Sequence, residues 1–355
     1  MNLRSEVIHA PPYSFHPPAE GIKLDQNELP YPLPDHVRAE VARVAAEVAL
    51  NRYPDLHAFT LRDRLAGIDA WDPEGVLVTS GSNVLLHYAV VAAGIGRTVL
   101  TVSPTFSVYS LQARILGARL VEVPLGAGFS LPVDELVREL GAGEGVLIIA
   151  NPAAPTGNLH PDAEVERLIE AAAGRWLVVL DEAYHAFSGT DLSRFARLPN
   201  VLVVRTLSKA AGLAGLRIGY GLCEPALARQ LTKVMIPFNV SELQQAVAGV
   251  VLDHRETLAG QVREVVAERA RIEGAMAGLD GVEVFQSSTN FVLFRVEDAA
   301  GVYGALRERG VLIRLQDHLP GLDGCLRVNA GLREENDAFL EALASAVGKG
   351  TEVSA

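Results

Sequence analysis

Short runs of apolar, largely β-branched residues recur between about residues 60 and 235, and stretches with helical periodicity separate them. Apolar runs that alternate with helices indicate strands buried on both faces of a mostly parallel sheet. Helices such as those expected over 84–93, 132–140 and 162–173 would cover this sheet. The predicted strands are GVLVT, TVLTV, LVEV, VLIIA, WLVVL, VLVVR and RIGYG.

A second, shorter pattern follows toward the C-terminus. A long helical stretch over about 242–278 leads into the runs FQSSTNFVLF, VLIRL and GCLRVNAG, with helices expected at about 301–309 and 333–346. This order predicts a smaller C-terminal α/β domain. The predicted division is an arm over 1–34, a large domain over 35–250 and a small domain over 251–355.

The first 34 residues contain seven of the 19 prolines. Proline lacks a backbone donor and interrupts helices, so this segment is predicted to be an extended arm without a helix, lying on another surface. Such an arm often crosses to a partner subunit. From Asp35 onward, valines recur at helical spacing, which predicts a helix over 35–50. We expect this helix to pack on the small domain.

The charge balance favours a small-molecule partner. Asp and Glu outnumber Lys and Arg by 43 to 31, which gives a formal net charge of −12, and no basic run is present. Nucleic acid and anionic membranes are therefore excluded as main partners.

The start has no signal-peptide pattern and no later stretch of about 18 residues is continuously apolar, so we expect a soluble, cytoplasmic protein. The two cysteines exclude a disulfide framework, and no metal-ligand spacing occurs.

Lysine is rare in this chain, which narrows the search for a reactive amine. The lysines are Lys23, Lys209, Lys233 and Lys349, and the other basic residues are arginines. Lys209 follows a buried run, in a segment (TLSKAAGLAGLRIGYG) whose other charge is Arg217. Small and apolar neighbours lower the pKa of a lysine, as an amine nucleophile requires. The alternative is a lysine whose ammonium group reaches the surface along an apolar stem.

Polar, turn-rich segments follow four of the predicted strands. Ligands bind beyond the carboxyl ends of parallel strands, so these segments indicate one site. The first segment, Ser80–Asn83, opens a predicted helix, and the free N–H groups at a helix start suit a phosphate. An ordinary N-cap is the alternative. The chain has no P-loop and no GxGxxG motif. The four segments are Ser80–Asn83, Asn151–Pro152, Asp181–Tyr184 and Thr206–Lys209.

Eight segments, in order through nearly the whole chain, carry a family resemblance. They are LDQNELPYPLP (24–34), NRYPD (51–55), SPTFSVYS (103–110), NPAAPTG (151–157), DEAY (181–184), RTLSKAAGLAGLRIGY (205–220), STNFVLF (288–294) and GCLRVNAG (324–331). Together they resemble pyridoxal-phosphate enzymes of the aspartate-aminotransferase fold, and within it the histidinol-phosphate aminotransferase family. The resemblance implies fold type I, an α/β architecture with a mostly parallel seven-stranded sheet between helices and a smaller C-terminal domain.

The resemblance also implies pyridoxal 5′-phosphate as the cofactor. Lys209 is then expected to bond to the cofactor aldehyde and to move the proton at the substrate Cα. Asp181 would keep the pyridine nitrogen protonated, Tyr184 would donate to the phenolate oxygen, and Phe106 would stack on the ring. The phosphate contacts implied are Gly81, Ser82, Asn83, Thr206, Ser208 and Arg217, with Tyr53 reaching in from the second subunit of a homodimer.

The implied reaction is transamination between histidinol phosphate and 2-oxoglutarate, giving imidazole acetol phosphate and glutamate in histidine biosynthesis. Arg314 and Arg327 would bind the substrate anions through their planar guanidinium groups, and Tyr31 would add a hydroxyl. A surface ion pair is the alternative for Arg314. An aromatic amino acid aminotransferase and a threonine-phosphate decarboxylase share these features. A non-catalytic binding module that kept the fold is a more distant alternative.

Three positions depart from the family pattern. Ala154 stands where an asparagine usually precedes Pro-Thr-Gly and donates to the phenolate oxygen. Loss of that donor is expected to raise the pKa of the imine that joins Lys209 to the cofactor by about a unit or more, if no other donor compensates. Leu29 replaces a second asparagine of the arm motif, and Asn83-Val84 stands where an Asp-Glu pair is common.

Overall fold

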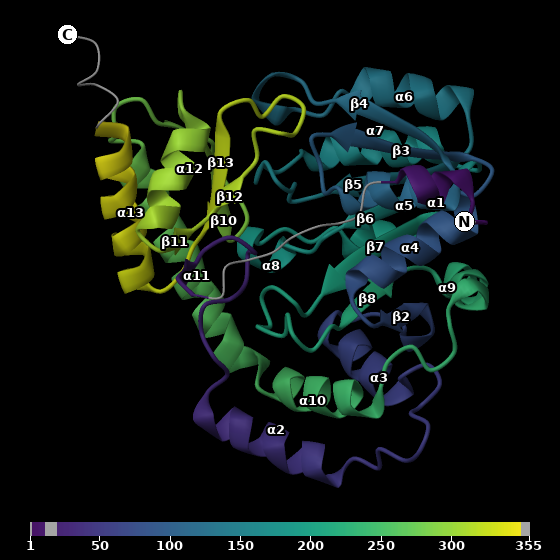
Figure 1. The fold of residues 1–355 in the computed structure, drawn as a ribbon. Helices are drawn as coiled ribbons and strands as arrows, with labels where there is room; N and C mark the ends of the chain where they lie inside the picture. The colour runs from purple at the N-terminus through teal and green to yellow at the C-terminus, as the bar shows by residue number, and fades with distance from the viewer. Residues whose placement is uncertain (1, 11–19, 349–355) are drawn as a thin grey trace.

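The computed structural model describes residues 2–10 and 20–348, and a seven-stranded sheet lies at its centre (Figure 1). The strand order is β2-β8-β7-β6-β5-β3-β4. The pairs β2–β8 and β8–β7 are antiparallel and the remaining pairs are parallel. Every strand predicted for the large domain is confirmed. The bounds are β2 Val76–Thr79, β3 Thr98–Ser103, β4 Arg119–Pro124, β5 Gly145–Ala150, β6 Trp176–Asp181, β7 Val201–Thr206 and β8 Gly219–Leu222.

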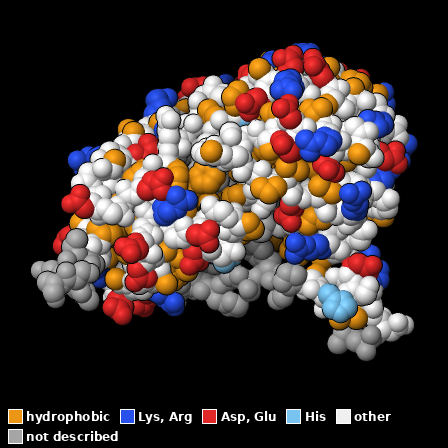
Figure 2. Space-filling view, turned by 90° about the horizontal axis from the view of Figure 1, so that it is seen from above, with side chains coloured by type: hydrophobic (Ala, Val, Ile, Leu, Met, Phe, Trp, Pro, Cys, Tyr) orange, Lys and Arg blue, Asp and Glu red, His pale blue; other side chains and the backbone are white. Residues whose placement is uncertain are grey.

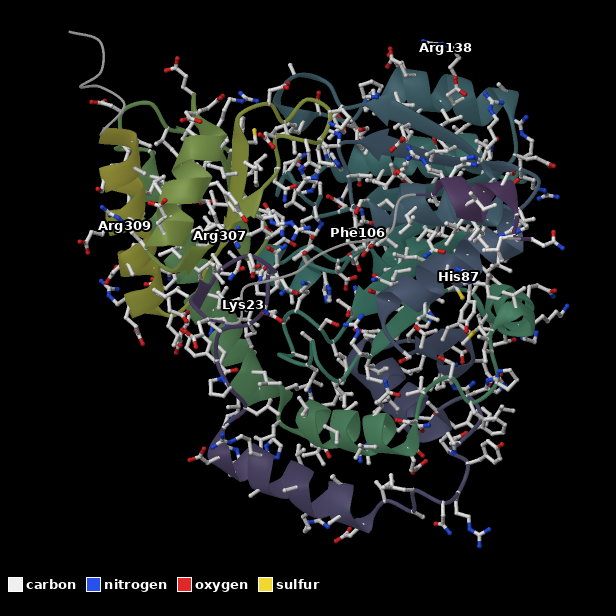
Figure 3. The ribbon with its side chains drawn as sticks, viewed as in Figure 1. Lys23, His87, Phe106, Arg138, Arg307 and Arg309 are labelled. Carbon is white, nitrogen blue, oxygen red and sulfur yellow. The ribbon has the colours of Figure 1, made fainter. Side chains whose placement is uncertain are left out.

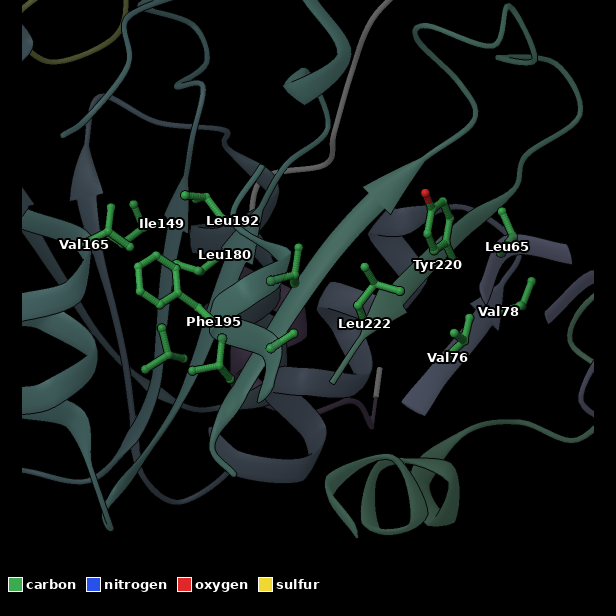
Figure 4. Close-up of a cluster of buried hydrophobic side chains, with 14 of the residues drawn as sticks. Leu65, Val76, Val78, Ile149, Val165, Leu180, Leu192, Phe195, Tyr220 and Leu222 are labelled. Carbon is green, nitrogen blue, oxygen red and sulfur yellow. The ribbon is translucent and has the colours of Figure 1, made fainter. Parts of the chain in front are cut away.

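Helices cover both faces of this sheet. Alternate residues of each strand point to opposite faces, so Val178 and Leu180 join one core whereas Leu177 and Val179 join the other. The first core, part of which is shown in Figure 4, packs against α3 (Phe59–Ile68), α6 (Val133–Ala142), α7 (Asp162–Ala172) and α10 (Glu242–Asp253). The second packs against α4 (Ser82–Ala93), α5 (Val108–Leu116) and α9 (Pro225–Leu231).

The helical stretch predicted over 242–278 is two helices. α10 begins at a capping box of Ser241 and Gln244, and α11 (Arg255–Met276) follows it directly. His254 separates them because its ψ of 19° is not helical. Figure 1 shows α11 rising from the end of α10 toward the C-terminal strands, so this helix connects the two parts of the molecule.

The C-terminal part is built on a four-stranded antiparallel sheet of order β12-β13-β10-β9. Its core contains α11, α12 (Ala299–Glu308) and α13 (Arg333–Gly348), together with Leu24 of the arm. In the arm, β1 (Ile22–Lys23) pairs in parallel with β11 (Val311–Leu312). The remaining strands are β9 Glu283–Val284, β10 Phe291–Arg295, β12 Arg314–Leu315 and β13 Cys325–Asn329. The smaller α/β part is thus present, while its boundary at residue 251 remains a prediction.

Two expectations about the N-terminal region are wrong. A short helix, α1 (Ser5–His9), lies within the segment predicted to lack helices, because the first proline is at position 11, beyond its end. Residues 11–19 of the arm lie outside the described residues. The helix over 35–50 is α2 (Asp35–Glu47), and it packs on α10 rather than on the C-terminal part. Its apolar side chains, Val37 foremost, belong to the core of the large sheet.

Short helical turns complete the described chain. Among its residues, no helix is long and apolar enough to cross a membrane. Figure 2 shows acidic and basic side chains mixed over one face of the molecule. The turns are α8 His185–Ser188, η1 Pro73–Gly75, η2 Ala127–Phe129, η3 Ser193–Arg197 and η4 Thr232–Val234.

A buried ion network lies behind the ends of β6 and β7. Arg205 donates to Glu182 Oε2 from Nε and Nη2, at 2.9 and 2.7 Å. It also donates to Asp69 and Asp191, each at 2.7 Å. Glu182 is fully buried and accepts a further bond from the Leu192 N–H at 2.7 Å. The network therefore fixes the chain directly after Asp181.

Replacing Arg205 should destabilise the fold strongly. In Arg205→Met the Glu182 carboxylate stays buried without its cation, which costs about 3–5 kcal/mol. The matched control is Arg167→Met, since Arg167 pairs with Asp134 at 2.9 Å while both side chains are exposed. That pair should contribute at most about 1 kcal/mol. Urea unfolding of both variants measures the difference, and equal losses would contradict the role given to the buried network.

Candidate active site

A cavity of about 430 Å³ lies where the carboxyl ends of the parallel strands face the arm and the C-terminal sheet. Figure 3 shows Phe106, one of the residues that line the cavity, between the large sheet and the C-terminal sheet. Most of the residues singled out from the sequence meet here. They are Ser82, Asn83, Phe106, Asp181, Tyr184, Thr206, Ser208, Lys209, Arg217, Arg314 and Arg327.

Lys209 lies just after β7 and reaches across to the arm. Its Nζ donates to the carbonyl oxygen of Gln26 at 2.8 Å. Burial, together with the positive charge of Arg327, lowers the pKa of Lys209 to about 7. Near pH 7 a large fraction of this amine is therefore neutral, which is the nucleophilic form.

Asp181 ends β6 on the face that packs against α5. The Tyr109 hydroxyl donates to its Oδ2 at 2.7 Å, and the Ala183 N–H donates to its Oδ1 at 3.0 Å. Burial raises the pKa of Asp181 above its ordinary value. Tyr109 was not predicted as a site residue, although it lies three residues after Phe106 and the two rings meet edge to face at 5.7 Å.

Tyr184 lies close to the amine of Lys209. Its ring centroid is 5.8 Å from Lys209 Nζ, and its edge contacts Phe291 at 5.3 Å between centroids. The side-chain amide of Asn27 donates to the Tyr184 hydroxyl oxygen at 2.8 Å. Burial raises the pKa of Tyr184. Asn27 was also missed from the sequence, although it belongs to the segment LDQNELPYPLP.

The N-terminus of α4 and Arg217 form a cradle for an anion. Arg217 Nη1 donates to Ser208 Oγ at 3.0 Å. Gly81 caps α4 with a φ of 94°, and a Cβ there would lie 2.7 Å from Arg217 Nη2. Gly81 therefore lets the guanidinium approach the helix end, although it does not itself line the cavity. Free helix N–H groups beside a guanidinium suit a phosphate.

Two arginines approach the cavity from the C-terminal sheet. Arg314 of β12 and Arg327 of β13 are direct cross-strand partners. Arg327 Nη2 donates to the Asp25 carbonyl at 3.0 Å, and its guanidinium lies 5.1 Å from the Phe291 ring centroid. Side by side, these guanidinium groups suit anionic substituents of a substrate.

Besides Gly81, two predicted residues do not line the cavity in this chain. Tyr53 is 84% exposed, and its ring stacks on Phe238 at 4.9 Å. Tyr31 lies outside the cavity lining, and burial together with the nearby Glu264 carboxylate raises the pKa of Tyr31 to about 12. Ala154 does line the cavity, and it shares a core with Tyr184.

The geometry agrees with the comparisons with known proteins. The family model "Aminotransferase class I and II" matches residues 19–343. The histidinol-phosphate aminotransferase of Deinococcus radiodurans is 45% identical over 344 residues, covering 96% of this chain and 95% of that protein. The one from Chlorobaculum tepidum is 38% identical over 327 residues, covering 91% and 93%. A crystal structure of the Sinorhizobium meliloti enzyme in complex with pyridoxal-5′-phosphate superposes with a TM-score of 0.89, at 24% identity and 98% coverage of each chain.

The chain belongs to the aminotransferase class I and II family, which depends on pyridoxal phosphate. The residues present fit that cofactor. A buried carboxylate, Asp181, suits a protonated ring nitrogen, and the amine of Lys209 suits the aldehyde. The cradle of Arg217 and the α4 N-terminus, which a Cβ at position 81 would fill, suits the phosphate.

The lowered pKa of Lys209 predicts how cofactor capture depends on pH. With a pKa of about 7, the neutral fraction of the amine rises about tenfold between pH 6 and pH 8 and then levels off. Stopped-flow absorbance of cofactor-free protein mixed with pyridoxal phosphate measures the capture rate. A lysine with the ordinary pKa, such as free Nα-acetyl-lysine, serves as the control. A rate that keeps rising about tenfold per pH unit through pH 9 would contradict the lowered pKa.

Proposed function

We propose that this protein transfers an amino group between histidinol phosphate and 2-oxoglutarate. The observation that carries the proposal is the pair of Arg314 and Arg327 at the same cavity as Lys209 and Asp181. Histidinol phosphate carries a phosphate, and 2-oxoglutarate carries a distal carboxylate, so both substrates need an anion site. The curated relatives that share most of this chain's length carry the same activity in their names.

The proposed chemistry divides among few side chains. Pyridoxal phosphate, when bound, supplies an electron sink for the negative charge formed at the substrate Cα. Lys209 Nζ, of which a large fraction is neutral near pH 7, takes the proton from that carbon. Asp181, oriented by Tyr109, keeps a proton on the ring nitrogen. Phe106 covers the ring and excludes water.

The remaining contacts hold the anions. Ser82, Asn83 and the α4 N-terminus bind the cofactor phosphate, together with Arg217. Thr206 Oγ1 accepts from the Ser208 N–H at 3.1 Å, which fixes the turn in which both residues line the cavity. Arg314 and Arg327 bind the substrate phosphate or the distal carboxylate in alternate half-reactions. Binding both anions at one place is consistent with a reaction that uses the two substrates in turn.

We also propose a cytoplasmic homodimer. Tyr53 and Phe238 form an exposed apolar patch, since both side chains are exposed and their rings are in contact. Leu50 and Ile236, close to them in sequence, are exposed too. Patches of this kind mark interfaces. In the proposed dimer the patch is covered, and Tyr53 reaches the cofactor phosphate of the partner. Both cysteines are buried and free, as expected in a reducing compartment. Sedimentation of an active monomer would contradict this assembly.

A donor screen tests the proposed substrate. With 2-oxoglutarate as acceptor, kcat/KM should be highest for histidinol phosphate and at least about tenfold lower for phenylalanine, which lacks the phosphate. Threonine phosphate should give neither transamination nor carbon dioxide. Arg327→Lys should lower kcat/KM for histidinol phosphate about 10- to 100-fold, because an ammonium group does not bind a phosphate bidentately. Arg307→Lys, at an exposed position on α12, is the control and should leave it unchanged. A better rate with phenylalanine would overturn the assignment.

A further inference from the structure

Asn27 is the point at which the arm is fixed over the cavity. Its backbone N–H donates to Asn329 Oδ1, and its carbonyl accepts from Asn290 Nδ2, both at 3.0 Å. Its φ of 55° lies in the left-handed region, which asparagine adopts more readily than most residues. Asn290 and Asn329 belong to neighbouring segments of the C-terminal sheet. These two bonds fix the backbone of Asn27, and with it the position from which the side chain extends.

The side-chain amide of Asn27 ends at Tyr184. Its Nδ2 donates to the hydroxyl oxygen at 2.8 Å, and both residues are buried. A hydroxyl that accepts such a bond directs its own proton away from the amide. It is also a stronger donor, because consecutive hydrogen bonds polarise one another. Ala154, which packs in the same core, offers Tyr184 only a methyl group.

We infer that Asn27 is a positioning residue for Tyr184: its amide donates to the hydroxyl oxygen and leaves the hydroxyl proton for the ring oxygen of the cofactor. The inference rests on the proposed function. It assigns the arm a part in tuning the cofactor, besides its contacts with the C-terminal sheet. A purely structural alternative is that Asn27 only anchors the arm.

The inference predicts a direction of change in the titration of the loaded protein. A hydrogen bond from Tyr184 stabilises negative charge on the ring oxygen of the cofactor. When that bond weakens, the oxygen holds the proton of the neighbouring nitrogen more tightly. The pKa at which the visible absorption of the bound cofactor changes should therefore rise.

Other charged and titratable groups that act on Tyr184 or Lys209 come from several elements. None of these groups is altered when Asn27 is replaced by an uncharged residue. A shift in the pKa of the absorption change is then due to the loss of the Asn27 amide. These groups are Asp181 of β6, Tyr109 of α5, Arg327 of β13, Arg217 of the loop after Lys209, and Lys23 and Glu28 of the arm.

The test is a pH titration of visible absorption in five proteins: the unaltered protein, Asn27→Gly, Asn27→Asp, Tyr184→Phe and the double variant Asn27→Gly/Tyr184→Phe. Asn27→Gly removes the amide at a φ that glycine tolerates, and Asn27→Asp keeps the shape but can only accept from Tyr184. Both should raise the pKa of the absorption change, Asn27→Gly by about 0.5–1 unit. In a Tyr184→Phe background, Asn27→Gly should add no further rise, because the group through which it acts is gone.

The outcomes separate the inference from the proposed function. If the unaltered protein shows no visible band with pyridoxal phosphate, the proposed function fails. If it titrates normally but Asn27→Gly leaves the pKa unchanged, or shifts it equally in the Tyr184→Phe background, only the inference fails. Loss of cofactor binding in both Asn27 variants, with binding retained in Tyr184→Phe, would show a structural role and also overturn it.

Discussion

The large sheet is covered by helices on both faces, so polar side chains meet a ligand only where its strands end. Because β5, β6 and β7 run parallel, the segments that follow them reach the same edge. Asp181 is buried there and Lys209 is partly buried, and removal from water disfavours the charged forms of both. Tyr109 donates to Asp181, and the Gln26 carbonyl accepts from Lys209. The chemistry proposed for the site follows from this burial.

The arm and the C-terminal sheet close the other side of the same cavity. β1 joins the arm to β11, and Asn27 joins it to Asn290 and Asn329. The arm thereby contacts three groups with different proposed tasks. The Asp25 carbonyl accepts from Arg327, the Gln26 carbonyl accepts from Lys209, and the Asn27 amide donates to Tyr184. A movement of the arm would therefore affect substrate and cofactor contacts together.

Features with a local signal in the sequence were predicted well. The central strands β5, β6 and β7 are largely apolar runs, Asp181 ends the second of them, and Lys209 comes shortly after the third. Features that depend on partners distant in sequence were not predicted. Nothing local indicates that Tyr109 meets Asp181, or that Asn27 meets Tyr184 from 157 residues away. The prediction for α2 was wrong for the same reason, because its sequence shows an apolar stripe but not the element against which the stripe packs.

The central claim is that Lys209 is the amine on which the site depends. Borohydride reduction of the protein loaded with pyridoxal phosphate, followed by peptide mass mapping, locates the lysine that carries the cofactor. We expect one phosphopyridoxyl group per chain, on Lys209, and none after Lys209→Ala. Finding the phosphopyridoxyl group on Lys23 or Lys233, or finding no labelled peptide at all, would contradict the account.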